Sequence, residues 1–362
     1  MSAFVVAARR TAVIPRGGAF AALSIEALGA PVIAACLAAA GIAPEAVDEV
    51  ILSNALGAGG NPARRVALAA GLPDRVAGLS IDRQCAGGLD ALLLARALVA
   101  SGAAEVVLAG GVESYSRRPL RFATDPAGGA AVAYDQPPFT PWPDRDPAMA
   151  GAAAALAAAW GISRTEQDDW AIASHAKARA ADMSGEIVPL LGQFGDAFTR
   201  NLTPALAARA KGLCGPISVA NTAVAADAAA FVIVTTAARA ARMPRALRIA
   251  AAVTLGAAPD QPGTAPLPAI ARALRLAGIS PAEVTVAEVM EAYAVQAIAC
   301  VRGAGLDPAR VNLCGGALAR GHPVGASGAV LAVRLFHTLR RGHGLATIAA
   351  AGGIGTAVVL QV

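Results

Sequence analysis

The chain has 362 residues, of which 56% are hydrophobic and 15% charged, so it can bury a sizeable core and differs from disordered chains, which combine low hydrophobicity with high charge. Its net charge of +5 and pI near 9.3 suit an anionic partner, but the basic clusters are pairs such as Arg9-Arg10 and Arg340-Arg341, and only 4% of residues are aromatic. The sequence therefore argues against nucleic acid, and a phosphorylated small molecule is the better-matched anion.

Cysteine and histidine usage argues against a disulfide framework or a zinc site. The five cysteines are an odd number without a CxxC pair, and the four histidines lack HExxH spacing. Residues 1–16 carry arginines where a signal peptide needs its apolar region, and the uncharged run 27–44 is mostly alanine with Pro31 inside it. We therefore expect a cytoplasmic protein without bound metal, in which 27–44 forms a buried helix rather than a membrane span.

Short apolar runs alternate with longer stretches rich in alanine and leucine along the first third of the chain. Strands are expected at 49–53, 79–82 and 105–109, and helices at 63–70 and 89–100. This alternation predicts an α/β fold with largely parallel sheets. The helix at 89–100 is apolar on nearly every side, so we expect it to be buried on most sides.

The middle of the chain differs in composition. Residues 117–216 are richer in proline, tryptophan and charge, and Ser163 followed by Glu166 predicts a capping box at the start of a helix. We interpret this region as an inserted lid or loop domain.

Two segments far apart in the chain share one pattern. A small-residue turn at 85–88 opens an apolar helix, and the strand after it ends near Gly110; a similar turn at 325–328 opens a second helix, and the strand after it ends near Gly352. This internal repeat predicts two halves of one design, each with a central helix. If the two central helices meet in the core, the loop before 325 lies near the turn at 85.

Cys85, in the first of these turns, is the candidate nucleophile. It lies between the expected strand at 79–82 and the helix beginning near Gly88, where unpaired N–H groups and the helix dipole lower the pKa of a thiol and the glycines admit a substrate carbonyl. Cysteines are commonly buried structural residues, yet this context makes Cys85 the expected most reactive thiol. The cysteines expected to be structural are Cys36, Cys214 and Cys300.

His322 is the candidate partner of Cys85. It lies in a glycine-rich loop at 314–328 whose backbone can approach a ligand closely. A neutral imidazole there can accept a proton from a thiol or donate to a thioester carbonyl oxygen. Loop histidines are more commonly structural, but the repeat brings this loop toward Cys85, so we expect the two side chains within hydrogen-bonding reach.

Motifs along nearly the whole chain resemble those of the thiolase family, the acyl-CoA C-acyltransferases. The segments that carry the resemblance are ARRT at 8–11, GNPAR at 60–64, RQCAGGLDA at 83–91, GGVESYS at 110–116, loop residues 161–168 and 174–175, and the run from GGA at 315–317 to GHPVGASG at 321–328.

The resemblance implies a thiolase-like α/β fold, with two similar mixed α/β halves in five-layered α-β-α-β-α stacking and an inserted loop domain. The amino-terminal half would comprise residues 1–116 and 219–244, the loop domain over the coenzyme A site 117–218, and the carboxy-terminal half 245–362. A homodimer or homotetramer is also implied, with coenzyme A as part of the substrate and no covalently bound cofactor.

Ping-pong acyl transfer is implied in the same way. Cys85 would be acylated by an acyl-CoA with activation by His322, and the acyl group would then pass to a second acceptor. The backbone N–H groups of Cys85 and Ala351 would form the oxyanion hole. His175, in the loop domain, is interpreted as structural.

Four positions depart from the family's pattern. Ala349 replaces the second cysteine, which moves the α-proton, and Met290 replaces the asparagine that positions a water beside the enolate. Ala223 replaces the serine that approaches coenzyme A, and Cys314 stands where an asparagine is usual, so both changes bear on coenzyme recognition. Claisen chemistry thus lacks its base, worth about 10²–10⁴-fold in rate, and its enolate stabiliser, whereas acylation of Cys85 remains possible.

Two function classes remain open. The first is a thiolase-type acyltransferase with impaired or altered Claisen chemistry, in which His322 handles the protons and the acyl donor or the outcome is nonstandard. The second is a thiolase-like paralogue without activity that serves as a binding or assembly partner. Retention of Cys85 and the histidine loop favours the enzyme, and the lost polar positions favour the paralogue. Glu291 could replace the missing base, although its role in the family pattern is structural.

Overall fold

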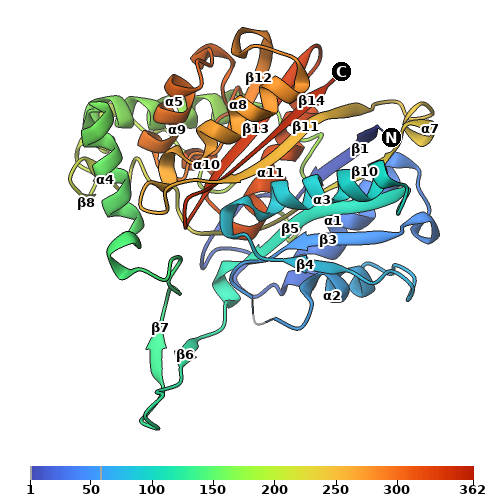
Figure 1. Ribbon diagram of the computed structural model, residues 1–362, viewed down its shortest axis with the longest axis horizontal. Coiled ribbons are helices and arrows are strands. Elements are labelled where there is room, and N and C mark those ends of the chain that lie inside the picture. Colours follow the sequence, from blue (N-terminus) through green and yellow to red (C-terminus); the bar gives the residue numbers. More distant parts are fainter. Residues whose placement is uncertain (1, 58) are drawn as a thin grey trace.

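The computed structural model describes residues 2–57 and 59–362. The strands of its main sheet are β1 (Ala3–Arg10), β2 (Ile14–Pro15), β3 (Glu49–Ser53), β4 (Leu79–Ile81), β5 (Val106–Ser114), β10 (Ala226–Thr236), β11 (Leu247–Gly256), β12 (Val284–Val289), β13 (His343–Ala350) and β14 (Ile354–Gln361). The helices on this sheet are α1 (Ile25–Ala40), α2 (Pro62–Ala69), α3 (Gly87–Ser101), α8 (Pro266–Ala277), α9 (Ala294–Gly303) and α11 (Val324–Thr338). The strand order is β12-β13-β14-β11-β1-β10-β5-β3-β4, with β2 paired to β10 (Figure 1).

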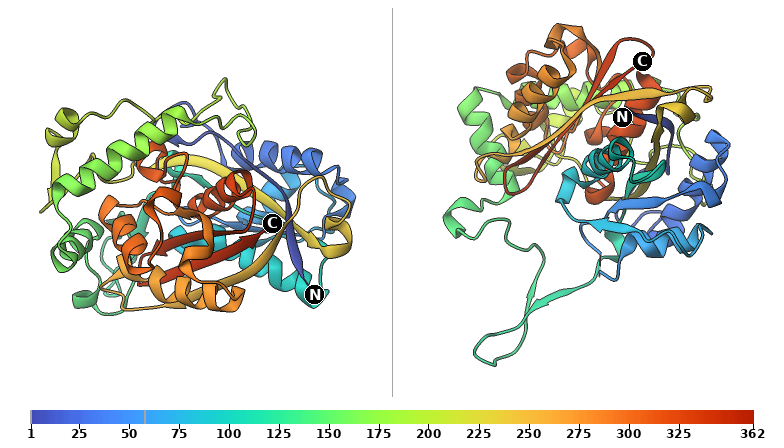
Figure 2. Two further views of the ribbon diagram at one scale, coloured as in Figure 1. Left: turned by 90° about the horizontal axis from the view of Figure 1, so that it is seen from above. Right: turned by 45° about the vertical axis from the view of Figure 1, so that its right-hand side comes forward.

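The helices and the two halves of the main sheet form alternating layers. β1 and β11 meet in a short junction, where Phe4 pairs with Arg248 and Val5 with Leu247, and this junction separates an amino-terminal half-sheet from a carboxy-terminal one. α3 and α11 pack together between the half-sheets, while α1 and α2 cover the outside of the first and α8 and α9 the outside of the second (Figures 1 and 2). The expected five-layered α-β-α-β-α stacking is confirmed, and both halves share its central layer.

The two half-sheets have the same topology, which confirms the predicted repeat. β3 runs parallel to β5, and β5 pairs antiparallel with β10, which pairs antiparallel with β1. In the same way β12 runs parallel to β13, and β13 pairs antiparallel with β14, which pairs antiparallel with β11. The prediction of largely parallel sheets is therefore wrong: each half is mixed, because its last strand returns antiparallel to the strand after the central helix.

Glycines let the two central helices approach closely. A Cβ atom on Gly88 would lie 2.3 Å from the backbone nitrogen of Ala329, and one on Gly328 would lie 2.5 Å from that of Leu89. Side chains at these positions would force α3 and α11 apart. The crossing occurs near the amino-terminal ends of both helices, so it brings together the turns that precede them.

The apolar helices pack inside the molecule. The uncharged run at 27–44 forms α1, which ends at Ala40 and buries Leu28, Val32 and Ile33. The window Gln84–Ser101, which contains α3, is long and apolar enough to cross a membrane by length and composition alone, but half of it is buried inside the folded chain. The contacts of α3 with α11 and both half-sheets are those of a core helix in a folded protein.

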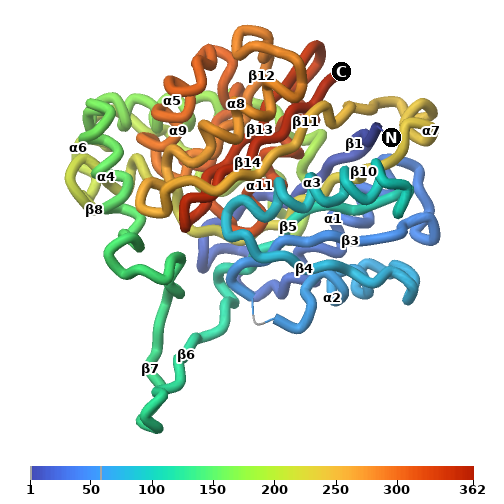
Figure 3. Tube along the Cα trace, viewed as in Figure 1, coloured from blue at the N-terminus to red at the C-terminus, as the bar shows by residue number. Residues whose placement is uncertain are grey.

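The chain between β5 and β10 forms elements outside the main sheet. The principal ones are the hairpin β6 (Arg121–Ala123) and β7 (Val132–Tyr134), α4 (Met149–Trp160), α5 (Arg164–Ala180), α6 (Pro204–Ala208), and the pair β8 (Gly212–Cys214) and β9 (Ile217–Ser218). The β6–β7 hairpin projects away from the body of the molecule (Figures 1, 2 and 3). Ser163 caps α5, because its Oγ accepts from the Glu166 N–H at 3.1 Å. The predicted capping box is only half formed, because the Glu166 carboxylate pairs with Arg302 and not with the backbone N–H of Ser163.

Candidate active site

A cavity of about 400 Å³ opens where the two halves and the inserted region meet. The residues of the amino-terminal half that line it include Cys85 and Tyr115, and those of the carboxy-terminal half include Tyr293, His322 and Ala349. The inserted region adds Arg118, Arg121, Phe139, Met149 and Leu156 to the lining. The cavity thus combines both sequence-predicted catalytic residues with a wall supplied by the inserted region.

Cys85 lies in a sharp connection between a strand and a helix. β4 ends at Ile81, a 3₁₀ turn spans Gln84–Ala86, and α3 begins at Gly87. Gln84 adopts a φ of 45°, in the left-handed region that costs a non-glycine residue about 1 kcal/mol or more. Its N–H donates to Asp82 Oδ1 at 2.9 Å, which holds the turn. This geometry presents the sulfur of Cys85 to the cavity.

His322 is fixed from both sides of its ring and by its backbone. Its N–H donates to the carbonyl of Val224 at 2.7 Å, and Nδ1 lies 2.6 Å from Ser327 Oγ in the first turn of α11. Nε2 lies 3.2 Å from Cys85 Sγ, which confirms the predicted proximity. When Nδ1 carries the proton and donates to Ser327, Nε2 is left as an acceptor for the thiol proton.

Burial favours the neutral forms of both groups. It lowers the pKa of His322 to about 4 and raises the pKa of Cys85 to about 12, with Glu113 and Asp82 adding negative charge near the sulfur. The expectation of a lowered thiol pKa from the helix terminus is therefore wrong, because desolvation and these carboxylates outweigh that effect. The site rests as a neutral thiol beside a neutral imidazole, so activation of Cys85 requires transfer of its proton to His322.

The acid limb of the pH profile follows from the His322 environment. Because its pKa is lowered from 6.5 to about 4, the imidazole stays neutral and able to accept the thiol proton below pH 6. We expect the rate of Cys85 acylation by acetyl-CoA, measured by quenched-flow intact mass, to stay level as the pH falls through 6.5 and to decline only as it approaches about 4. A decline centred near pH 6.5 would contradict this picture of a desolvated imidazole.

Glu113 connects the two halves beneath the site, a role that the sequence did not reveal. Its carboxylate accepts N–H groups from Gly325 at 2.9 Å and Ala55 at 3.1 Å, and from the Asn54 side chain at 2.8 Å. Burial raises the pKa of Glu113 to about 7 despite these donors. In the sequence, the only indication that Glu113 matters is its position within the family-like GGVESYS segment. Its partners before α11 and after β3 are seen only in the structure.

The four altered positions separate into two groups. Ala349 and Ala223 line the cavity, as does Ala351, whose N–H was expected in the oxyanion hole. Met290 is 1% exposed and packs in the hydrophobic core, and Cys314 lies outside the cavity lining. The cavity therefore lacks the thiol of a second cysteine at position 349, while the Met290 side chain contributes to packing.

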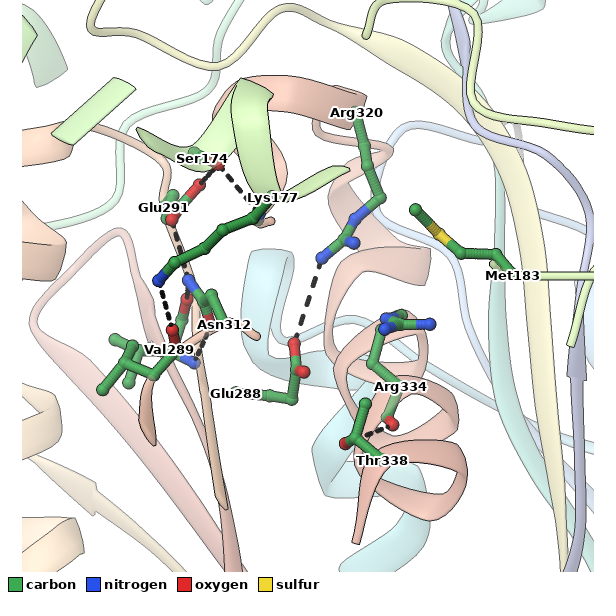
Figure 4. Close-up of polar contacts among 12 residues, drawn as sticks. Ser174, Lys177, Met183, Glu288, Val289, Glu291, Asn312, Arg320, Arg334 and Thr338 are labelled. Atoms are coloured by element: carbon green, nitrogen blue, oxygen red, sulfur yellow. Dashed lines mark hydrogen bonds and ion pairs between the residues drawn. The ribbon is translucent and has the colours of Figure 1, made fainter. Parts of the chain in front are cut away.

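Glu291 and His175 have structural partners. The Glu291 carboxylate accepts from Ser174 Oγ and Asn312 Nδ2 (Figure 4) and from Trp170 Nε1, all at 2.8–3.0 Å, and so joins α5 to the segment after β12. His175 is 1% exposed, and its Nδ1 accepts the backbone N–H of Arg200 at 3.3 Å. Neither lines the cavity, so Glu291 cannot replace the missing base from its place in this structure.

Comparisons with known proteins agree with the motifs and the fold. Residues 3–238 match the family model of the thiolase amino-terminal domain, and residues 243–362 match that of the thiolase carboxy-terminal domain. The chain is 37% identical to an acetyl-CoA acetyltransferase of Cupriavidus necator, with 99% of this chain and 98% of the relative covered. It is 38% identical to an acetyl-CoA acetyltransferase of Rhizobium meliloti, with the same coverage.

The fold also matches that of a solved structure. Superposition on the crystal structure of human mitochondrial 3-ketoacyl-CoA thiolase gives a TM-score of 0.92 at 31% sequence identity, covering 99% of this chain and 98% of that one. Family models span both halves, and full-length relatives exceed 30% identity. The chain therefore belongs to the thiolase family and is a thiolase-type acyltransferase.

Proposed function

We propose that the protein transfers acyl groups from acyl-CoA through a thioester on Cys85, as an acetyl-CoA acetyltransferase or 3-ketoacyl-CoA thiolase does. The observation that carries the proposal is the 3.2 Å contact between His322 Nε2 and Cys85 Sγ inside the cavity. His322 takes the thiol proton as the sulfur attacks the acyl carbonyl, and the N–H groups of Cys85 and Ala351 bind the resulting oxyanion. The oxyanion collapses, the bond to the coenzyme A sulfur breaks, and the coenzyme A thiolate leaves with the proton from His322, so the acyl group stays on Cys85. An acceptor then attacks this thioester and Cys85 is released.

Coenzyme A enters as part of the substrate, and the protein holds no covalent cofactor. The inserted region 117–218 acts as the loop domain over the coenzyme, a role supported by its side chains in the cavity wall. The proposal includes a cytoplasmic homodimer or homotetramer; the exposed apolar side chains of the β6–β7 hairpin, such as Phe122 and Val132, favour association.

Carbon–carbon bond chemistry is altered in this protein. A family member with a second cysteine at position 349 has a thiol there that can exchange a proton with the α-carbon, and Ala349 has none. Acylation of Cys85 does not use that group. The two half-reactions therefore differ in how much of their machinery this chain retains.

Incubation with acetyl-CoA tests the proposal. We expect intact-mass measurement to show addition of one acetyl group, and peptide mapping to place it on Cys85; longer acyl-CoAs then define the chain-length preference. Cys36 and Cys300 are fully buried and should remain unmodified, whereas exposed Cys214 reports non-specific acylation. Absence of any Cys85 adduct would contradict the proposal and favour a paralogue without activity.

A further inference from the structure

Cleavage of a carbon–carbon bond next to a thioester carbonyl leaves an enolate, and its carbon must receive a proton. If the proposed acyl transfer extends to 3-ketoacyl-CoA, as this inference assumes, the cavity must contain a donor for that proton. Ala349 cannot supply one. His322 already holds the proton of Cys85 at that stage, because its Nε2 is the acceptor for the thiol.

The charged groups and the other phenol on the cavity wall have partners of their own. The Tyr115 hydroxyl lies 3.4 Å from Arg118 Nη1, which donates to it, and Arg118 also pairs with Asp135 at 2.5 Å. Asp82 accepts the N–H of Gln84, and Arg121 donates to the carbonyl of Ala55 at 3.2 Å. These groups are carboxylates, guanidinium groups, or the Tyr115 phenol, whose ring lies against the guanidinium groups of Arg16 and Arg118. The Thr222 hydroxyl, which also lines the cavity and has no partner among the described residues, is an alcohol and so a far weaker acid than a phenol.

Tyr293 is different. It caps the start of α9, and its backbone bridges to Thr222, so the segment that carries it is held against the chain before β10. Its ring packs against the apolar cluster of α4 and α9 that includes Ala153 and Ile298. The side chain is only partly buried, and it lines the cavity together with Cys85 and Ala349.

The Tyr293 phenol is protonated and unengaged. Burial raises its pKa above the ordinary value of 10, and a negative charge on Cys85 raises it further. Within residues 2–57 and 59–362, no side chain or backbone group forms a hydrogen bond with its hydroxyl. The phenol is therefore a proton donor available to a bound substrate.

We infer that Tyr293 supplies the proton that the second cysteine supplies elsewhere in the family. In thiolysis, the Cys85 thiolate forms a bond to the C3 carbonyl carbon, the C2–C3 bond breaks, and its electron pair passes to the enolate. The Tyr293 O–H bond then breaks and its proton forms a C2–H bond, which releases acetyl-CoA and leaves a phenolate. The phenolate takes the thiol proton of the incoming coenzyme A, whose sulfur attacks the acyl-enzyme and displaces Cys85.

The single-oxygen change Tyr293→Phe tests this inference, because it keeps the ring that packs on α4 and α9. We expect thiolysis of acetoacetyl-CoA to fall by about 10²–10⁴-fold, the usual worth of one acid–base group. Acylation of Cys85 by an aryl thioester should stay within about 3-fold, because its leaving thiolate needs no proton. Tyr134→Phe, on the exposed hairpin, is the matched control and should not change thiolysis.

A second variant separates a chemical role from a structural one. In Tyr293→Phe, the further change Ala349→Cys places a thiol on the same cavity wall and is expected to restore at least 10-fold of the lost thiolysis. Thiolysis that is unchanged in Tyr293→Phe, or absent from the unaltered protein while Cys85 is still acylated, would overturn the Tyr293 assignment but leave the proposed acyl transfer intact. If Cys85 forms no adduct with any acyl thioester, the proposed function itself fails.

Discussion

Replacing Cys85 with alanine is expected to abolish the acyl-enzyme and to reduce acyl transfer by roughly 10⁴–10⁶-fold, the loss found when a nucleophile is removed from a covalent catalyst. Among the described residues, Cys85 is the one thiol at the cavity that contacts an imidazole. Its Sγ lies 3.2 Å from His322 Nε2. Without the sulfur, His322 has no proton to accept and no thioester can form. Steady-state thiolysis of acetoacetyl-CoA and intact mass after acetyl-CoA measure the two effects.

Cys214→Ala is the matched control for the loss of a thiol. Cys214 is exposed in β8 and lies outside the cavity, so this variant should acylate and turn over as the unaltered protein does. Thermal unfolding should distinguish a chemical from a structural effect of Cys85→Ala, since the side chain is only partly buried. Acyl transfer that persists in Cys85→Ala would mean that the thioester forms elsewhere or that no covalent intermediate is needed.

The sequence predicted those features that depend on repeated motifs or on the composition of a single helix. The matching turns at 85–88 and 325–328 were sufficient to predict that Cys85 and His322 meet, because two equivalent helices in one core must bring their preceding loops together. The same repeat predicted the two halves of the fold. Apolar composition predicted the buried position of α3, since a helix without a polar face cannot lie at the surface.

Predictions failed where the outcome depended on distant neighbours. The pKa of Cys85 is set by desolvation and by Glu113, which reaches the site from β5, and a helix-terminus argument includes neither effect. Met290 could be aligned with a polar family position, but its own side chain packs in the core. No sequence pattern singles out Tyr293, because its access to the cavity depends on the bridge to Thr222 and on the packing of α4.

A buried charge network also escaped prediction, because Arg9-Arg10 resembles a surface pair in the sequence. The Arg10 side chain is fully buried: Nε donates to Glu186 at 2.7 Å, and the two terminal nitrogens donate to Asp196 at 2.6 and 3.0 Å. Glu186 also pairs with Arg334 of α11. In the same region Arg320 lies 4.0 Å from Glu288 (Figure 4). The network therefore joins β1 to the inserted region and to the central layer that carries the active site.

Replacing Arg10 with methionine is expected to destabilise the fold by about 3–5 kcal/mol, because it leaves the buried Asp196 carboxylate without its ion-pair partner and Glu186 with Arg334 alone. Burial is the largest single effect and alone would raise the pKa values of Glu186 and Asp196, but the charge and hydrogen bonds of Arg10 and the charges of neighbouring arginines together outweigh it and lower both. Groups with lowered pKa values contribute stability above their unfolded pKa, and this contribution is lost as the pH falls through the folded value. The deficit of the variant should therefore stay level from pH 7 to about pH 5 and shrink as the pH falls below the ordinary pKa values of 4.5 for Glu186 and 3.8 for Asp196, as measured by urea unfolding at each pH.

Arg9→Met provides the matched comparison one residue away on the same strand. Arg9 is partly exposed, and its guanidinium donates to the neighbouring carbonyl of Ala8, so its replacement should cost less than about 1 kcal/mol. Adding Asp196→Asn to Arg10→Met should recover part of the loss, because removing one unpaired carboxylate relieves the charge imbalance that the first change creates. A deficit for Arg10→Met that is small, or equal at pH 7 and pH 3, would show that the arginine acts through packing rather than as the counter-ion of Glu186 and Asp196.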